Sequence, residues 1–241
     1  MMTLDHATSQ TATGAGDYWT ASERRPWIRD MSHWRGQGRW KDDAAWLSIG
    51  QQHVAMVRRM MRAAGTSTPV RRMLEWGPGG GANAVAFAPW LETFYGVDIS
   101  RPNLQECGRQ LKASGFDGFH PIHIPAANPT AVMDHGAHPV DLFLSTAVFQ
   151  HFPSQAYGIS VLNLARKLLG RDGLALIQIR YDDGTDDVRC KSGEYNDATA
   201  VTFTSYRIDA FWQLAEQAGF EPLSVTLQRE SLYAYYALRA A

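Results

Sequence analysis

The sequence predicts an α/β protein in which helices cover both faces of a doubly wound, mainly parallel sheet. From Val70 onward, short apolar runs alternate with windows of helical periodicity, a pattern typical of such a sheet. A glycine-rich turn lies between the first apolar run and an alanine-rich helical window, where backbone N–H groups can approach a ligand. The chain has 241 residues, 45% of them hydrophobic, which is enough for one sizeable core and one domain.

The N-terminal part of the sequence has a different amino-acid composition. Residues 1–16 have no apolar core and are expected to be a disordered lead-in. Residues 17–66 are rich in tryptophan and arginine and are expected to be helical, and residues 67–241 are expected to form the α/β domain.

The helix before the sheet is expected over 43–64, with Asp42 or Asp43 as its N-cap. One face of this window carries apolar residues at helical spacing, namely Leu47, Val54, Val57 and Met61. Further helices are expected near 81–91, 101–113, 129–134 (a weak one), 154–169 and 206–218. Ser100 and Ser154, each next to a proline, supply start signals for two of these helices.

The expected strands lie between these helices, at residues 70–76, 93–98, 119–124, 140–145 and 173–180. Residues 170–173, GRDG, are expected to be a turn. The polar stretch 182–204 has no period and is expected to be a long functional or mobile loop. Gly219 is expected to cap the last helix, and the extended runs 221–229 and 231–239 are expected to pair as a hairpin at one edge.

Charge and cysteine content exclude several classes of protein. Lys and Arg total 23 against 24 Asp and Glu, a net charge of −1, which does not favour nucleic acid binding. Cys107 and Cys190 have the spacing of neither metal ligands nor a disulfide framework, so we expect no metal site and a reducing compartment. No run approaches the ~20 apolar residues of a membrane span. We therefore expect a cytoplasmic protein, without a nucleic acid or membrane partner, that is a monomer or a homodimer.

The glycine turn fits two patterns. Gly77, Gly79 and Ala82 satisfy the dinucleotide fingerprint G-x-G-x-x-A, and Asp98, about 20 residues on, would take a ribose hydroxyl. An NAD-dependent oxidoreductase is therefore one alternative. The second pattern, acid-x-Gly-x-Gly-x-Gly, is formed by Glu75, Gly77, Gly79 and Gly81. A carboxylate at Glu75 repels a pyrophosphate and favours a cationic ligand, which supports the second pattern.

Through this second pattern the chain resembles the class I S-adenosylmethionine-dependent methyltransferases, whose first motif has the same form. VDLFLSTAVFQHFPS, residues 140–154, is similar to the fourth-strand motif of that family, and LLGRDGLALIQI, residues 168–179, to its fifth-strand block. The resemblance implies a Rossmann-like sheet of seven strands with the last one antiparallel, and an N-terminal helical lid. It also implies S-adenosyl-L-methionine as the cofactor and in-line methyl transfer to a small-molecule acceptor.

The resemblance assigns roles to the residues around the turn. Glu75 would anchor the loop and help to hold the methionine ammonium, and Gly77 and Gly79 would let the backbone pass under the cofactor. Asp98 would accept both ribose hydroxyls, because one carboxylate has two oxygens, and Ile99 would lie against the adenine. The remaining positions implied to contact the cofactor are Gly81 in the glycine motif and Ser145 and Ala147 at the methionine end.

One departure from the family concerns the adenine. Members often have an acid after the third strand that holds the adenine amino group, whereas this chain has Ala126 and Ala127 there. Recognition of the adenine would then fall to the backbone or to His123 or Asn128, and the sequence leaves this choice open.

The segment 17–66 is interpreted as a lid over the cofactor, with Tyr18 or Trp19 nearest the ligand. Aromatic faces stabilise a cation by about 0.5–2 kcal/mol, and an arginine of this segment can pair with the methionine carboxylate. The alternative is that the tryptophans only pack against the sheet. Interleaved Arg and Trp also suggest single-stranded nucleic acid, but the stretch 24–41 is too local, and the protein too neutral, to favour that.

His151 is the candidate general base, because it follows the fourth strand and imidazole has a suitable pKa. The alternative is that His151 only braces its turn. Tyr195, Asn196 and Tyr206 are weaker candidates on the acceptor side. The main alternative activity is cyclisation of the cofactor itself, as in azetidine-2-carboxylate synthases, which release methylthioadenosine; a further alternative is a binding module without activity.

Overall fold

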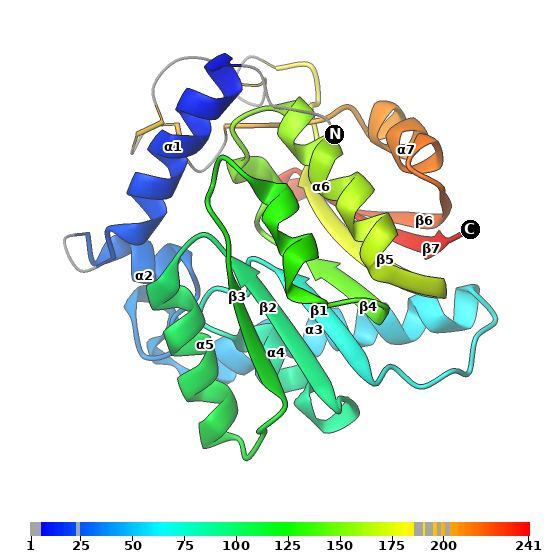
Figure 1. Ribbon diagram of the computed structural model, residues 1–241, viewed down its shortest axis with the longest axis horizontal. Coiled ribbons are helices and arrows are strands. Elements are labelled where there is room, and N and C mark those ends of the chain that lie inside the picture. Colours follow the sequence, from blue (N-terminus) through cyan, green and yellow to red (C-terminus); the bar gives the residue numbers. More distant parts are fainter. Residues whose placement is uncertain (1–5, 23–24, 186–189, 191–194, 197–198, 201–202) are drawn as a thin grey trace.

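The computed structural model describes residues 6–22, 25–185, 190, 195–196, 199–200 and 203–241. Its centre is a seven-stranded sheet with the strand order β3-β2-β1-β4-β5-β7-β6 (Figure 1). The strands are β1 Arg72–Trp76, β2 Thr93–Asp98, β3 Phe119–His123, β4 Val140–Ser145, β5 Leu169–Arg180, β6 Phe220–Gln228 and β7 Tyr233–Ala240. Strands β1 to β5 pair in parallel, and β7 is antiparallel to both β5 and β6. The predicted doubly wound, seven-stranded sheet with an antiparallel last strand is confirmed.

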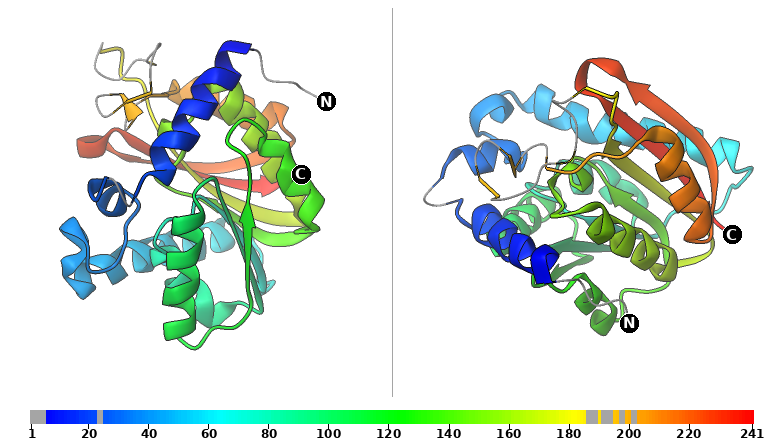
Figure 2. Two further views of the ribbon diagram at one scale, coloured as in Figure 1. Left: turned by 60° about the vertical axis from the view of Figure 1, so that its left-hand side comes forward. Right: turned by 90° about the horizontal axis from the view of Figure 1, so that it is seen from above.

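Helices cover both faces of this sheet. They are α1 His6–Thr20, α2 Trp27–Met31, α3 Asp43–Ala63, α4 Ala82–Phe87, α5 Arg101–Ala113, α6 Gln155–Leu168 and α7 Ile208–Gln217. Helices α3, α4 and α5 lie on one face, and α6 and α7 lie on the other (Figures 1 and 2). The predicted caps are in place: Asp42, Ser100 and Ser154 each accept a backbone N–H in the first turn of α3, α5 and α6. No helix in the described ranges has the length and apolar character needed to cross a membrane.

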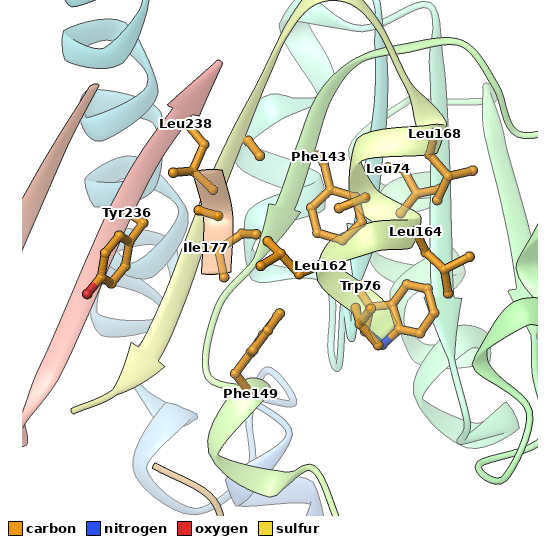
Figure 3. Close-up of a cluster of buried hydrophobic side chains, with 14 of the residues drawn as sticks. Leu74, Trp76, Phe143, Phe149, Leu162, Leu164, Leu168, Ile177, Tyr236 and Leu238 are labelled. Carbon is orange, nitrogen blue, oxygen red and sulfur yellow. The ribbon is translucent and has the colours of Figure 1, made fainter. Parts of the chain in front are cut away.

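Alternation along the strands divides the core into two layers. In β1, Leu74 and Trp76 point toward α6, whereas Met73 points toward α3 and α4. Figure 3 shows the first layer, in which side chains of β1, β4, β5 and β7 meet those of α6. Glu75 shares the side of Met73, so the acid predicted to matter lies under α3 and α4.

The N-terminal residues differ from the expectation. The structure forms helix α1 over His6–Thr20, where residues 1–16 were expected to be a disordered lead-in. The buried side of α1 carries Thr8, Ala12, Ala15 and Trp19, which recur at helical spacing. Small side chains let α1 pack closely although its sequence is barely apolar, and for that reason its composition gave no helix signal.

Three further expectations differ in detail. The helix expected over 81–91 ends at Phe87 and continues as a 3₁₀ turn, because Pro89 has no N–H to donate. The turn expected at 170–173 is instead an irregular part of β5: Leu169 pairs with Val140 and Leu174 pairs with Leu142. The weak helix near 129–134 is a 3₁₀ helix, Pro129–His135. Most of the loop expected over 182–204 lies outside the described residues.

Candidate functional site

The glycine turn connects β1 to α4 and is tightly enclosed. Gly77 and Gly79 have φ values of 78° and 52°, a region that favours glycine. A Cβ at Gly77 would lie 2.4 Å from Cγ2 of Val148, and a Cβ at Gly79 would lie 2.5 Å from the carbonyl oxygen of Ser32. Gly81 caps α4 in the left-handed conformation and packs against Cys107. The turn is therefore closed from two sides by segments distant in sequence.

One of these segments precedes α3. The N–H of Gly80 donates to the Ser32 carbonyl at 2.7 Å, and a Cβ at Gly80 would lie 2.4 Å from the His33 carbonyl oxygen. Trp34 Nε1 donates to Asn103 Oδ1 at 2.9 Å. Part of the predicted lid thus packs directly on the glycine motif.

A cavity opens beside the turn, at the carboxyl ends of β1, β2 and β4. The predicted site residues that line it are Trp19, Gly77, Gly79, Asp98, Ile99, Ala147 and His151. Helix α1 forms one wall through Ala12, Ala15 and Trp19. Figure 2 shows this helix next to one end of the sheet, beside α6. The position agrees with the general rule that ligands of open α/β sheets bind outside the carboxyl ends of the strands.

Asp98 ends β2 at the edge of the cavity and is held by its neighbours. Oδ1 accepts the N–H of Ser100 at 2.8 Å, and Oδ2 lies 3.4 Å from Nδ2 of Asn103. Burial raises the pKa of Asp98 to about 6, against the hydrogen bonds from Ser100 and Asn103, which lower it. The carboxylate is fixed in orientation, as a group that binds two hydroxyls needs to be.

Glu75 does not line the cavity but lies directly behind it. Its side chain is 1% exposed, and Oε1 accepts Nδ2 of Asn83 at 2.6 Å. Oε2 is buried and has no hydrogen-bond partner among the described residues. Burial raises the pKa of Glu75 to about 8; the hydrogen bond from Asn83 lowers it and the charge of Asp98 raises it further. A buried carboxylate with one free oxygen is costly on its own and suits a nearby cation.

Asn83 has two more partners, which no sequence motif indicates. Its Nδ2 also lies 3.0 Å from Oγ1 of Thr146, a cavity residue, and its Oδ1 lies 2.7 Å from Nδ1 of His53 on α3. These contacts join positions 30 to 63 residues apart in sequence, so spacing within one motif could not reveal them.

His151 lies where α1 meets the described part of the 182–204 loop. Its Nδ1 donates to the Ala200 carbonyl at 2.7 Å, and its ring lies 4.8 Å from that of Trp19. Trp19 Nε1 donates to the hydroxyl of Tyr195 at 2.7 Å, and that hydroxyl lies 3.0 Å from the His151 carbonyl oxygen. Burial lowers the pKa of His151 to about 4, although the Ala200 and Ala147 carbonyls raise it. At neutral pH the imidazole is therefore uncharged, with its proton on Nδ1.

The remaining predicted positions do not line the cavity. Ser145 Oγ donates to the Trp76 carbonyl at 3.2 Å and so supports the end of β1. Tyr18 packs its ring against those of Trp19 and Tyr195, each at 5.3 Å, behind the cavity wall. Tyr206 is buried against Phe149 and Phe211 in the core, and the N–H of Asn196 donates to Oγ1 of Thr199.

Two side chains were predicted as candidates for holding an adenine, His123 and Asn128. Neither His123 nor Asn128 lines the cavity: His123 Nε2 lies 3.2 Å from the Ile99 carbonyl oxygen, and Asn128 Oδ1 accepts from Thr130. Ala126 does line it, beside Ile99. His123 and Asn128 thus both make contacts outside the cavity.

His33 also lines the cavity, although it was not among the predicted site residues. It has a φ of 56°, its ring lies 4.8 Å from that of Trp40, and its carbonyl accepts Trp46 Nε1. Burial, and then the charge of Arg39, lowers the pKa of His33 to about 4. A single histidine in a tryptophan-rich stretch belongs to no known motif, so only its position in the fold identifies His33 as a cavity residue.

Charged groups are scarce around the cavity. Among the lining residues that the structure describes there is no Lys or Arg. Arg35 and Arg39 of the predicted lid instead pair with Asp43 and Asp30, and Arg24 lies outside the described residues. Within the described ranges, no three His, Cys, Asp or Glu side chains gather as a metal ion would need.

Comparison with known proteins places this site in a family. Residues 49–225 match the family model described as "Methyltransferase domain". No curated protein matches the sequence of the chain.

Solved structures share the fold at low sequence identity. Magnesium protoporphyrin IX methyltransferase (ChlM) from Synechocystis PCC 6803 with bound SAM is 15% identical, with a TM-score of 0.64 and 100% of each chain covered. The 1,6-didemethyltoxoflavin-N1-methyltransferase of Burkholderia thailandensis is 17% identical, with a TM-score of 0.62 and coverage of 100% of this chain and 93% of that one. The N-methyltransferase NodS from Bradyrhizobium japonicum WM9 is 13% identical, with a TM-score of 0.55 and coverage of 76% and 84%. This chain therefore belongs to the methyltransferase-domain family and has the Rossmann-like fold of the class I S-adenosylmethionine-dependent methyltransferases.

Proposed function

We propose that the protein transfers a methyl group from S-adenosyl-L-methionine to a small-molecule acceptor by in-line displacement. The observation that carries the proposal is the pair of buried carboxyl groups, Glu75 and Asp98, on either side of the enclosed glycine turn. A pyrophosphate would be repelled by an ionised Glu75, whereas an ammonium would be stabilised by it, and ribose hydroxyls would donate to Asp98.

The residues around the cavity fit the parts of this cofactor. Glu75, whose Oε2 is unpartnered within the described structure, would face the ammonium, and Asp98 would bind the ribose. Gly77 and Gly79 would give the backbone its close approach, and Ile99 would lie against the adenine. The positions that would support this set from behind are Gly81, Ser145 and Tyr18. When bound, the cofactor supplies a methyl group already activated by a sulfonium.

The chain itself aligns the acceptor and excludes water. Residues 17–66, now together with the rest of α1, form the proposed lid over residues 67–241. Trp19, linked to Tyr195, closes one side of the cavity and offers an aromatic face to a cation. His151 holds its proton on Nδ1, which leaves Nε2 as the proposed proton acceptor.

The lining also supports a class of acceptor. With two uncharged imidazoles, His33 and His151, and no Lys or Arg in its described part, the cavity suits an acceptor without a carboxylate or phosphate. We further propose a cytoplasmic location, which the two unpaired cysteines, Cys107 and Cys190, support, and a monomer or homodimer as the assembly.

A second candidate is cyclisation of the cofactor to azetidine-2-carboxylate. The aromatic lid, and the lack of Lys or Arg among the described lining residues, favour it, because that reaction needs no acceptor. NAD-dependent oxidation is the least supported, since Glu75 lies directly behind the turn.

One set of incubations separates these activities. With S-adenosylmethionine alone, methyl transfer predicts little product until an acceptor is added, and then adenosylhomocysteine; cyclisation predicts methylthioadenosine at once. Calorimetry with adenosylhomocysteine and with NAD tests the cofactor. Saturation by NAD alone would overturn the proposal.

A further inference from the structure

A chain of buried polar side chains joins α3 to the end of β1. His53 is 7% exposed, Asn83 5% and Glu75 1%. The distance from His53 Nδ1 to Asn83 Oδ1 is 2.7 Å, and that from Asn83 Nδ2 to Glu75 Oε1 is 2.6 Å. His53 is not a cavity residue and has no part in the chemistry proposed above.

When Glu75 is ionised, the chemistry of these atoms fixes the direction of each hydrogen bond. Asn83 Nδ2 gives its two protons to Glu75 Oε1 and to Thr146 Oγ1. Asn83 Oδ1 must then accept, so His53 Nδ1 carries the proton between them. If the amide of Asn83 were turned over, its oxygen would face an oxygen of the ionised Glu75 at 2.6 Å, which is unfavourable.

We propose that His53 is a positioning residue, which holds the amide of Asn83 in the orientation that favours the ionised form of Glu75 beside the ligand cation. The orienting role rests on the contacts alone, and only the identity of the cation rests on the proposed function. The histidine thereby links the helix that precedes the sheet to the first strand's acid.

Several ionisable groups face Glu75 from the elements packed around it. Burial is the main cause that raises the pKa of Glu75, and the carboxylate of Asp98 on β2 raises it further. Cys107 on α5 stays a thiol, because burial and then the charge of Glu75 raise its pKa. Burial lowers the pKa of His53 and keeps the imidazole neutral, so it acts as a hydrogen-bond donor and adds no charge. Asn83 alone opposes these effects on Glu75 by a hydrogen bond.

The first test needs no cofactor. Titration of the Glu75 carboxyl by ¹³C NMR, in protein with labelled glutamate, should show a pKa higher by about one unit in His53→Phe, the worth of one hydrogen bond to a charged group. Asn83→Ala should give the same rise. His53→Gln keeps an N–H donor and should restore the wild-type value. Val57→Ala, which removes buried atoms from the same helix without touching Asn83, is the matched control and should leave this pKa unchanged.

The second test measures binding of adenosylhomocysteine by calorimetry between pH 6 and 9. We expect His53→Phe to bind about tenfold more weakly at pH 7, and the difference from the wild type to shrink to about twofold at pH 9, where Glu75 is largely ionised in the wild type and about half ionised in the variant. A loss that is the same at every pH, and equal in Val57→Ala, would show that His53 only packs. An unchanged Glu75 pKa in both His53→Phe and Asn83→Ala would overturn the proposal. If the wild type binds no adenosylhomocysteine, the proposed function fails, and the titration still decides the role of His53.

Discussion

At the scale of single residues, the site is organised around a buried carboxyl group, Glu75. Its ionised form is unfavourable as long as no cation is bound beside it. Glu75 has one partner, Asn83, and a second oxygen with none among the described residues. The folded protein therefore holds its proton more tightly than an unfolded chain does, with a pKa of about 8 against 4.5. A raised pKa of an acid stabilises the folded state fully below pH 4.5, and this contribution is lost as the pH rises through about 8.

Glu75→Gln should remove this dependence on pH. We expect the unfolding free energy of the cofactor-free variant to equal that of the wild type near pH 5. At pH 9 it should exceed that of the wild type by about 1.4 kcal/mol or more, the value of at least one pKa unit. The same variant should bind adenosylhomocysteine more weakly, because the amide has no charge for the ammonium. Chemical denaturation at both pH values measures the first effect, and parallel curves for the two proteins would contradict it.

Asp98→Ala should weaken binding of adenosylhomocysteine by about 1–3 kcal/mol, the cost of lost hydrogen bonds to a charged acceptor. Calorimetry measures this directly. Asp141→Ala is a suitable control, because Asp141 accepts backbone N–H groups of Arg71 and Arg72 on the opposite end of β1. An unchanged dissociation constant for Asp98→Ala would remove the ribose assignment.

His151→Ala should lower turnover and leave cofactor binding nearly intact, if its Nε2 accepts the proton. Because the pKa of His151 is about 4, loss of activity below pH 7 should not come from this residue, and its acid limb should lie near pH 4. Profiles of kcat/KM against pH test this. If the variant turns over as fast as the wild type, His151 has only a structural role, through its hydrogen bond to the Ala200 carbonyl.

At the scale of elements, the crossing of α3 and α4 sets the position of the polar chain. Gly50 lies at that crossing, where a Cβ would be 2.4 Å from both the Ala82 carbonyl oxygen and Cβ of Ala86. His53, one turn further along α3, then comes into contact with Asn83 on α4. Close approach of two helices is thus a requirement of the site as well as of the core.

Gly50→Val should separate the two helices and destabilise the protein by about 1–3 kcal/mol, the usual cost of overpacking. Ala55→Val places the same side chain at an exposed position of α3 and serves as the control. Thermal unfolding of both variants measures the difference. Similar melting temperatures for the two variants would mean that α3 and α4 can move apart without loss of stability.

The elements also show what could be predicted from sequence. Strands such as β1 and β4 are buried on both faces, so they appear as apolar runs, and their predicted bounds agree with the structure within two residues. Helix α1 was not predicted because its packing depends on buried alanines, and alanine occurs in both buried and exposed positions, so the sequence does not reveal its burial. Glu75 and Asp98 could be predicted because they belong to a recognisable motif. His33 and His53 could not, because only contacts with residues far along the chain identify them.

At the scale of the whole molecule, the family match and the cavity do not coincide. The match covers 49–225, yet Ala12, Ala15, Trp19, Ser32 and His33 all line the cavity. One wall of the proposed site therefore comes from a part of the chain outside the shared domain.

Removal of residues 1–20 should separate binding from folding. The sheet and its two helical layers should still unfold cooperatively, whereas the affinity for adenosylhomocysteine should fall by about tenfold or more, since α1 and Trp19 no longer exclude water. Circular dichroism melting and calorimetry provide the two measurements, with removal of residues 1–5 as the control. Full affinity in the shorter protein would contradict a lid role for α1.

The contact of Ser32 and His33 with the second and third glycines of the turn has an evolutionary consequence. The backbone of this segment fills the space in which a side chain at Gly79 or Gly80 would lie. Homologues with a larger residue at either position must carry a displaced or shorter N-terminal segment, so the two regions should covary across an alignment. Exchange of N-terminal segments between relatives should succeed only where this pair of glycines is retained.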